Sequence, residues 1–210
     1  MDARGALELL EWKRRIFALY AEVRAEEEPA AGWERWRAVR DELFRSSTQS
    51  PLPPETRSAY PGVPFFPYDP AYRVLAEVED APAEARQVAS SGDETIAFER
   101  MGRAHFTLEG RDHVLELYWL AAYGGGLFVP FRDETSGRQT YGGGRYLLDT
   151  VKGSDLGTDD GRLVLDFNFA YNPSCSYDPR WVCPLSPPAN GLPVEIQAGE
   201  RMPAQRKEDC

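Results

Sequence analysis

Cysteine and histidine are scarce in this chain. Its 210 residues include the cysteines Cys175, Cys183 and Cys210 and the histidines His105 and His113. Three cysteines are too few, and odd in number, for a disulfide framework, which favours a reducing compartment, and we expect a cytoplasmic protein. Cys175 and Cys183 have seven residues between them, and no second pair follows. No four-ligand zinc set can be written from these residues, so we expect no metal.

Long apolar runs are also missing. No stretch approaches the roughly 20 apolar residues that a membrane-spanning helix needs, so we expect no membrane partner. At the start of the chain, charges from Glu8 to Arg15 interrupt every apolar run. This pattern lacks the apolar centre of a secretory signal. With 42% hydrophobic and 28% charged residues, the composition is that of a soluble globular protein.

Positive charge is in deficit. The chain has 24 Lys and Arg against 34 Asp and Glu, a net charge of −10. Residues 1–50 hold nine basic and ten acidic residues, so residues 51–210 hold 24 − 9 = 15 basic and 34 − 10 = 24 acidic ones. Such a surface repels phosphate backbones, so we expect no nucleic-acid partner. The sequence leaves open whether the chain forms a homo-oligomer.

The first 46 residues predict a helical arm. Leu9, Trp12, Ile16 and Tyr20 recur at spacings of three and four, which indicates an amphipathic helix over 6–28, interrupted at residue 29. The segment "GWERWRAVRDELF" predicts a second helix with its own apolar stripe. Its two tryptophans could contact a partner, but aromatics at this spacing are more often core. We therefore expect an N-terminal arm over 1–46 whose helical hairpin, over 6–46, packs on the rest of the chain.

Residues 47–71 differ from both their neighbours. They contain seven prolines, at 51, 53, 54, 61, 64, 67 and 70, together with several aromatic residues. Because proline cannot donate a hydrogen bond to a helix or to a central strand, this segment predicts an extended connector wrapping over the body. We expect a β body over 72–200 and a flexible tail over 201–210.

The period of the apolar residues changes to two after residue 72. Short segments rich in β-branched and aromatic residues, divided by Gly, Asp, Pro or Ser, lie at 72–80, 84–90, 95–110, 112–123, 126–133, 145–149, 162–168 and 192–198. Closely spaced strands without intervening helices are typical of an antiparallel β-sandwich or a partly closed barrel. The expected fold class is therefore mainly β (α+β), with the helical hairpin packed on the β body.

One hairpin allows a register to be predicted. A two-residue turn at Gly110 and Arg111 would pair Phe106 with Leu115 and Leu108 with His113. It would place residues 104, 106 and 108 on one face with 113, 115 and 117. His113 then lies at the edge of the core. His105 falls on the other face opposite Glu116, where the pair could orient the ring for general-base catalysis, although such pairs are more often structural.

The glycine runs predict no cofactor. "YGGGLF" and "YGGGR" match neither dinucleotide-binding nor P-loop spacing, and no G-x-S-x-G hydrolase motif occurs. Polar and aromatic residues concentrate in the last third instead. Asp166 and Asn168 would share the polar side of a strand, and an arginine buried near them needs such partners. The predicted ligand-binding set is Tyr141, Arg145, Tyr146, Asp166, Asn168, Tyr171 and Asn172.

Two stretches carry a resemblance to a known family. "FRDETSGRQTYGGGRYL" and "LDFNFAYNPSCSYDPRWVCPLSPPANGLPVEIQAGE" closely resemble the signature of the uncharacterised family catalogued as domain of unknown function 1684. The resemblance covers roughly residues 33–200. It departs mildly from the usual pattern at Ser176 and Ser186. The matching positions are Tyr141, Gly144, Arg145, Tyr146, Asp166, Asn168, Tyr171, Asn172, Pro173, Cys175, Tyr177, Cys183, Pro184, Asn190 and Glu200.

The family has no established reaction, ligand or cofactor, so several functions stay open. The first is the binding of a small anionic or polar ligand, with Arg145 holding a carboxylate or phosphate. If the protein is an enzyme, Asp166 or His105 is the candidate catalytic residue. The second is a thiol-based redox role for Cys175 and Cys183. The third is a protein-interaction module that uses the N-terminal helices.

Overall fold

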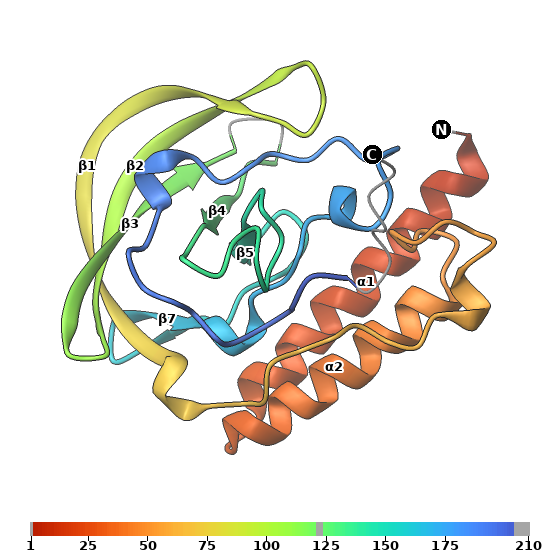
Figure 1. The fold of residues 1–210 in the computed structure, drawn as a ribbon, viewed down its shortest axis with the longest axis horizontal. Helices are drawn as coiled ribbons and strands as arrows, with labels where there is room; N and C mark the ends of the chain where they lie inside the picture. The colour runs from red at the N-terminus through yellow and green to blue at the C-terminus, as the bar shows by residue number, and fades with distance from the viewer. Residues whose placement is uncertain (1, 121–123, 204–210) are drawn as a thin grey trace.

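The computed structural model describes residues 2–120 and 124–203. Figure 1 shows two helices side by side on one flank of the molecule and a curved sheet on the other. Loops and the C-terminal segment lie between them. The predicted flexible tail over 201–210 falls mostly outside the described residues, and so does Cys210.

The helical arm consists of α1 (Ala3–Ala25) and α2 (Pro29–Ser46). The carboxylate of Asp2 caps α1 by accepting from the Gly5 backbone N–H, and Pro29 begins α2, where its missing N–H costs nothing. Both bounds lie within a few residues of the prediction. Neither helix, in the part of the chain that the structure describes, is long and apolar enough to cross a membrane.

The apolar stripes of both helices pack on the β body. Trp33 and Trp36 are 3% and 0% exposed and share a hydrophobic cluster with Phe98, Phe128 and other residues of the strands. Trp33 also donates through its Nε1 to the backbone carbonyl of Asn168, 2.9 Å away. The prediction that the tryptophans are core residues is confirmed.

The connector contacts both the β body and the helical arm. It contains two short 3₁₀ turns, η1 (Arg57–Ala59) and η2 (Pro70–Tyr72), and is otherwise extended or irregular. The Phe66 N–H donates to the Gly199 carbonyl, and Phe65 stacks edge-on against Trp36. These contacts attach the connector both to the C-terminal segment and to α2.

The strands form one antiparallel sheet that does not close. Its order is β5-β4-β3-β2-β1-β7-β6. The strands are β1 (Arg73–Ala89), β2 (Thr95–Leu108), β3 (Arg111–Trp119), β4 (Leu127–Phe131), β5 (Arg145–Asp149), β6 (Thr158–Asp159) and β7 (Arg162–Asp166). Strands β1, β2 and β3 curve around the interior in Figure 1. The expected mainly β, α+β fold is confirmed, and the segments predicted at 72–80 and 84–90 form one strand with an irregularity between Asp80 and Glu84.

The hairpin between β2 and β3 corrects the predicted register. Phe106 pairs with His113 and not with the expected Leu115, because the turn residues are Glu109 and Gly110. Both have positive φ, 52° and 71°, which is the geometry of a type I′ turn. The shift is two residues, so the predicted faces are confirmed while the pairs are wrong.

The partner predicted for His105 changes as well. His105 lies opposite Val114, and its Nε2 is 2.9 Å from Oε2 of Glu79 on β1. Glu116 is instead buried, where its carboxylate accepts from Arg100 and from the Tyr118 hydroxyl. His113 is 6% exposed and stacks on Phe106, in agreement with the predicted position at the edge of the core.

Two predicted strand segments have other structures. The strand expected over 162–168 ends at Asp166, and Phe167–Phe169 form a 3₁₀ turn, because the Asp166 carboxylate accepts from the Asn168 N–H. Residues 192–198 form no strand. Their alternate apolar side chains enter the core, but their backbone bonds to loops, as when Glu134 N–H donates to the Val194 carbonyl.

Candidate functional site

A cavity of about 320 Å³ lies between the helical arm and the β body. Helices α1 and α2, strand β5, the segment after it and the irregular segment 171–174 all contribute to its wall. The lining residues are Leu9, Trp12, Lys13, Ile16, Tyr20, Trp36, Arg40, Phe44, Gln49, Pro51, Tyr146, Val151, Lys152, Ser154, Tyr171, Asn172, Pro173, Ser174 and Trp181. Its volume is at the lower end of the range typical of small-molecule sites.

The wall of this cavity is mainly aromatic and aliphatic, and hydrogen bonds hold part of it in place. Tyr20 is 3% exposed, and its hydroxyl accepts from Trp36 Nε1 and from Ser154 Oγ, each at 3.0 Å. Burial raises the pKa of Tyr20 to about 12, so this hydroxyl stays protonated at neutral pH. The contact joins α1, α2 and the segment after β5, which makes the wall a preformed surface.

The charged residues that line the cavity are all cations. They are Lys13, Arg40 and Lys152, and no described lining residue is Asp or Glu. This absence is notable in a chain with ten more acids than bases. A carboxylate or phosphate entering the cavity would therefore meet cations and no described carboxylate on the wall itself.

Two of these cations are neutralised from outside the cavity. Arg40 is 7% exposed and forms a buried ion pair with Glu200, with Nε to Oε1 at 2.6 Å. Burial lowers the pKa of Arg40 but the Glu200 charge raises it, and the net direction is upward. Lys152 Nζ lies 3.3 Å from Asp149 Oδ2. Lys13 forms no ion pair or hydrogen bond with any residue of the described ranges.

Asn172 lies beside these cations with an unused acceptor. Its backbone N–H donates to Glu200 Oε2 at 2.7 Å, and its Nδ2 donates to the Arg201 carbonyl at 2.8 Å. These bonds fix the amide orientation and leave Oδ1 as a buried acceptor with no partner among the described residues. A buried acceptor left in this state costs about 1–3 kcal/mol.

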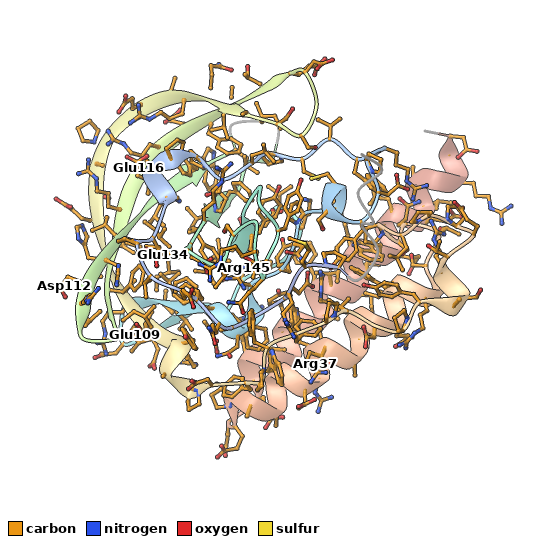
Figure 2. All side chains as sticks on the ribbon, in the orientation of Figure 1. Arg37, Glu109, Asp112, Glu116, Glu134 and Arg145 are labelled. Atoms are coloured by element: carbon orange, nitrogen blue, oxygen red, sulfur yellow. The ribbon has the colours of Figure 1, made fainter. Side chains whose placement is uncertain are left out.

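The structure places Arg145 away from this cavity. Figure 2 shows it at the centre of the molecule, and it is 1% exposed. Its guanidinium donates to Asp133 Oδ2 at 2.7 Å and to the backbone carbonyls of Ile196, Ala198 and Glu200. Protein acceptors therefore surround it, and it does not line this cavity. Its predicted role in binding a ligand gains no support from this placement.

The partner of Arg145 was missed in the sequence. Asp133 follows β4, and its Oδ1 accepts from the Thr135 N–H at 2.9 Å, which holds the loop in a local turn. The pattern Asp-x-Thr is a signal for such a turn, but not for an ion pair twelve residues away. Gly144, at φ +95°, brings the backbone before Arg145 against the Phe131 carbonyl, where a Cβ would lie only 2.6 Å away.

Asp166 and Asn168 bond to each other, and neither contacts Arg145. Asp166 Oδ1 accepts from both the backbone N–H and Nδ2 of Asn168, while its Oδ2 has no hydrogen-bond partner among the described residues. Asp166 also lines a second cavity of about 70 Å³, with Arg73 at 3.9 Å. Burial raises the pKa of Asp166 to about 6, against the opposing hydrogen bonds from Asn168.

The three predicted tyrosines divide between two places. Tyr146 and Tyr171 face each other across a backbone bridge, with reciprocal hydrogen bonds of 2.8 and 3.0 Å, and both line the larger cavity. The Tyr146 hydroxyl donates to the Pro184 carbonyl at 2.6 Å. Tyr141 lies outside this wall, with its hydroxyl 3.6 Å from Cys175 Sγ. Of the predicted set, Tyr146, Tyr171 and Asn172 therefore meet at the cavity.

The remaining candidates lie elsewhere. Cys175 and Cys183 are free and buried, 2% and 6% exposed. His105 lies on the sheet and lines neither cavity. Within residues 2–120 and 124–203, no group of three or more His, Cys, Asp or Glu side chains could hold a metal ion.

Comparison with known proteins agrees with the resemblance noted in the sequence. The family model described as "Protein of unknown function (DUF1684)" matches residues 58–201, and the chain belongs to this family. It is similar to an uncharacterised protein of Haloarcula marismortui solved by solution NMR, with 38% identity and a TM-score of 0.60. The match covers 86% of this chain and all of that one. No curated protein matches.

Proposed function

We propose that this member of the DUF1684 family binds a small amphipathic anion, such as a carboxylate with an apolar body, in the cavity between the helical arm and the β body. A small-molecule partner and a cytoplasmic location are part of this proposal. The observation that carries it is the charge of the cavity wall, which holds Lys13, Arg40 and Lys152 and no described carboxylate. Lys13 is the cation for which the described protein supplies no partner.

The rest of the wall favours the same class of ligand. Trp12 and Trp181, which are partly exposed, present flat apolar surfaces against which an alkyl chain or an aromatic ring can pack. Each methylene removed from water there contributes about 0.8 kcal/mol. Asn172 Oδ1 adds an acceptor for a hydroxyl or amide donor of the ligand, which would relieve its lack of a partner.

The experiment is a binding series on the full chain. Straight-chain carboxylates from hexanoate to dodecanoate, 2-naphthoate and inorganic phosphate are titrated while the fluorescence of the cavity tryptophans and the unfolding temperature are followed. We expect the affinity to rise with chain length until the cavity is full. At 100 times its dissociation constant, a ligand stabilises the fold by about 2.7 kcal/mol. Phosphate alone should bind weakly, since it has no apolar body.

The controls separate charge from burial. Lys13→Met removes the unpaired cation and should weaken carboxylates at least tenfold, because a charge-assisted hydrogen bond contributes about 1.5–3 kcal/mol. The matched control Arg14→Met makes the same change at the next position of α1, where the side chain is 63% exposed and paired with Glu11, and should have no effect. Ser174→Phe fills the cavity without changing charge and should abolish binding.

Two results would contradict the proposal. The first is the absence of any saturable binding by the carboxylates at millimolar concentration. The second is equal affinity of the carboxylates and their neutral amides for the wild-type chain, because the amide keeps the apolar body and loses the charge.

A further inference from the structure

Two cysteines lie next to one wall of the cavity, in the segment 171–184. Cys175 follows Ser174, which lines the cavity, and Cys183 stands two residues after Trp181, which also lines it. The Cys175 backbone N–H donates to Cys183 Sγ at 3.4 Å, and the two thiols hydrogen-bond to one another. Both cysteines are free.

The surroundings of the pair are unequal. Cys175 Sγ lies 3.6 Å from the Tyr141 hydroxyl, and hydrogen bonds from the thiol of Cys183 and from Tyr141 lower the pKa of Cys175 against the effect of burial. The hydrogen bond with Cys175 and burial raise the pKa of Cys183. A thiolate beside a protonated thiol is the arrangement of an attacking and a resolving cysteine.

Ser91, which follows β1, holds the Cys183 end of this segment in place. Ser91 Oγ accepts from the Cys183 backbone N–H at 3.0 Å and donates to the Trp181 carbonyl at 3.2 Å, while the Ser91 N–H donates to the Cys183 carbonyl at 2.9 Å. The turn after β1 therefore fixes the far end of the segment that carries Cys183. The thiols are held as neighbours by contacts other than their own.

We propose that Cys175 and Cys183 are a redox-active dithiol that reacts with hydroperoxides and closes reversibly to a disulfide. Cys175 is the attacking residue and Cys183 the resolving one. The site does not depend on the cavity ligand, because neither sulfur lines the cavity.

The reaction balances in two steps. The Cys175 thiolate attacks one oxygen of the hydroperoxide, so that an S–O bond forms, the O–O bond breaks, and the departing alkoxide takes up a proton and leaves as an alcohol or water. Cys183 then attacks the Cys175 sulfenic acid, so that the S–S bond forms, the S–O bond breaks, and hydroxide leaves as water with the Cys183 proton. The dithiol loses two electrons and two protons in total, and the peroxide gains them.

The test uses the full chain carrying Cys210→Ser, so that the two thiols of interest are the only ones present. The folded protein is treated with hydrogen peroxide, and intact mass, free thiols and peptide maps are recorded before and after dithiothreitol. We expect the loss of two hydrogen atoms and both thiols, a Cys175–Cys183 cross-link in the peptide map, and full reversal by the reductant. The cross-link is read on a chain with both cysteines intact, so it does not depend on variants that fold.

Single variants then assign the roles. On the same background, Cys183→Ser should hold Cys175 as a sulfenic acid that dimedone labels, while Cys175→Ser should consume peroxide at least tenfold more slowly. The proposal is overturned if both thiols survive peroxide in the folded protein, or if the only cross-links join separate chains. Dimedone labelling at Cys183 in the Cys175→Ser variant, at the rate seen for Cys175, would overturn the assignment of the attacking residue.

Discussion

Arg145 and Lys13 are both cations that face the interior of the protein, but their surroundings differ. Arg145, the first residue of β5, is buried against the C-terminal segment and donates to Asp133 and to several carbonyls. Lys13 lines the cavity between the helical arm and the β body, and the described residues give it no acceptor. The residue that the sequence favours as the ligand-binding cation is the satisfied one.

This difference separates a charge that is satisfied within the protein from one that we propose binds a ligand. A buried charge is retained only if its hydrogen bonds are made within the protein, and Arg145 makes them. A cation that faces a concave apolar wall without a carboxylate keeps its interaction free for a ligand. Arg40 lies between these cases, because it lines the cavity and is also paired with Glu200.

The largest expected effect is that of Arg145→Met. It leaves the Asp133 carboxylate, whose side chain is 0% exposed, without its counter-charge, and it frees carbonyls of the C-terminal segment. We expect a loss of about 3–5 kcal/mol in the free energy of unfolding, measured by urea denaturation. Arg138→Met is the matched control, because Arg138 is 64% exposed in its pair with Glu195, and it should cost less than about 1 kcal/mol. An Arg145→Met protein as stable as the control would show that the buried pair of Arg145 and Asp133 does not stabilise the fold.

The next-largest effect on stability concerns Asp166, a buried carboxylate with one oxygen that accepts no hydrogen bond from the described residues. Its pKa rises from 3.8 unfolded to about 6 folded, so its contribution to stability is complete below pH 4 and is lost as the pH rises through 6. The size of this loss is about 3 kcal/mol. Asp166→Asn keeps the acceptor for Asn168 and removes the ionisation.

The measurement compares denaturation of wild type and Asp166→Asn between pH 4 and pH 7. As the pH rises across this range, the free energy of unfolding of the variant should increase relative to that of the wild type by about 3 kcal/mol. Asp160→Asn is the control, because Asp160 has φ +50°, which asparagine tolerates, and its side chain is 90% exposed. If the difference in free energy of unfolding between wild type and Asp166→Asn were the same at every pH, Asp166 would have the same pKa in the folded and the unfolded protein.

The sequence predicts the elements of the fold better than the contacts between them. Helix bounds follow from local periodicity, and so do the faces of the hairpin. The register was wrong by two residues because Glu109, which is not a glycine, takes a positive φ in the turn. At residues 192–198 the alternation correctly predicts the buried side chains, but not that their backbone bonds to loops.

The candidate site was predicted only in part, because local patterns do not encode contacts between distant segments. Tyr146, Tyr171 and Asn172 were expected and do meet at the cavity. Leu9 and Trp12 belong to the same apolar stripe as the buried Ile16, so periodicity cannot tell a cavity wall from the core. The acceptors of Arg145 come from positions 12 to 55 residues distant, and no local pattern encodes such pairs.

The smallest expected effect on stability is that of Lys13→Met, and it is the sharpest test of the comparison. The substitution makes the same kind of change as Arg145→Met, from a long cation to methionine, at a site where no described acceptor loses its partner. The free energy of unfolding in urea should therefore change by less than about 0.5 kcal/mol, and a small gain is expected because methionine adds apolar surface to the wall. A loss comparable with that of Arg145→Met would place Lys13 among the structural charges, and the cavity would then have no cation reserved for a ligand.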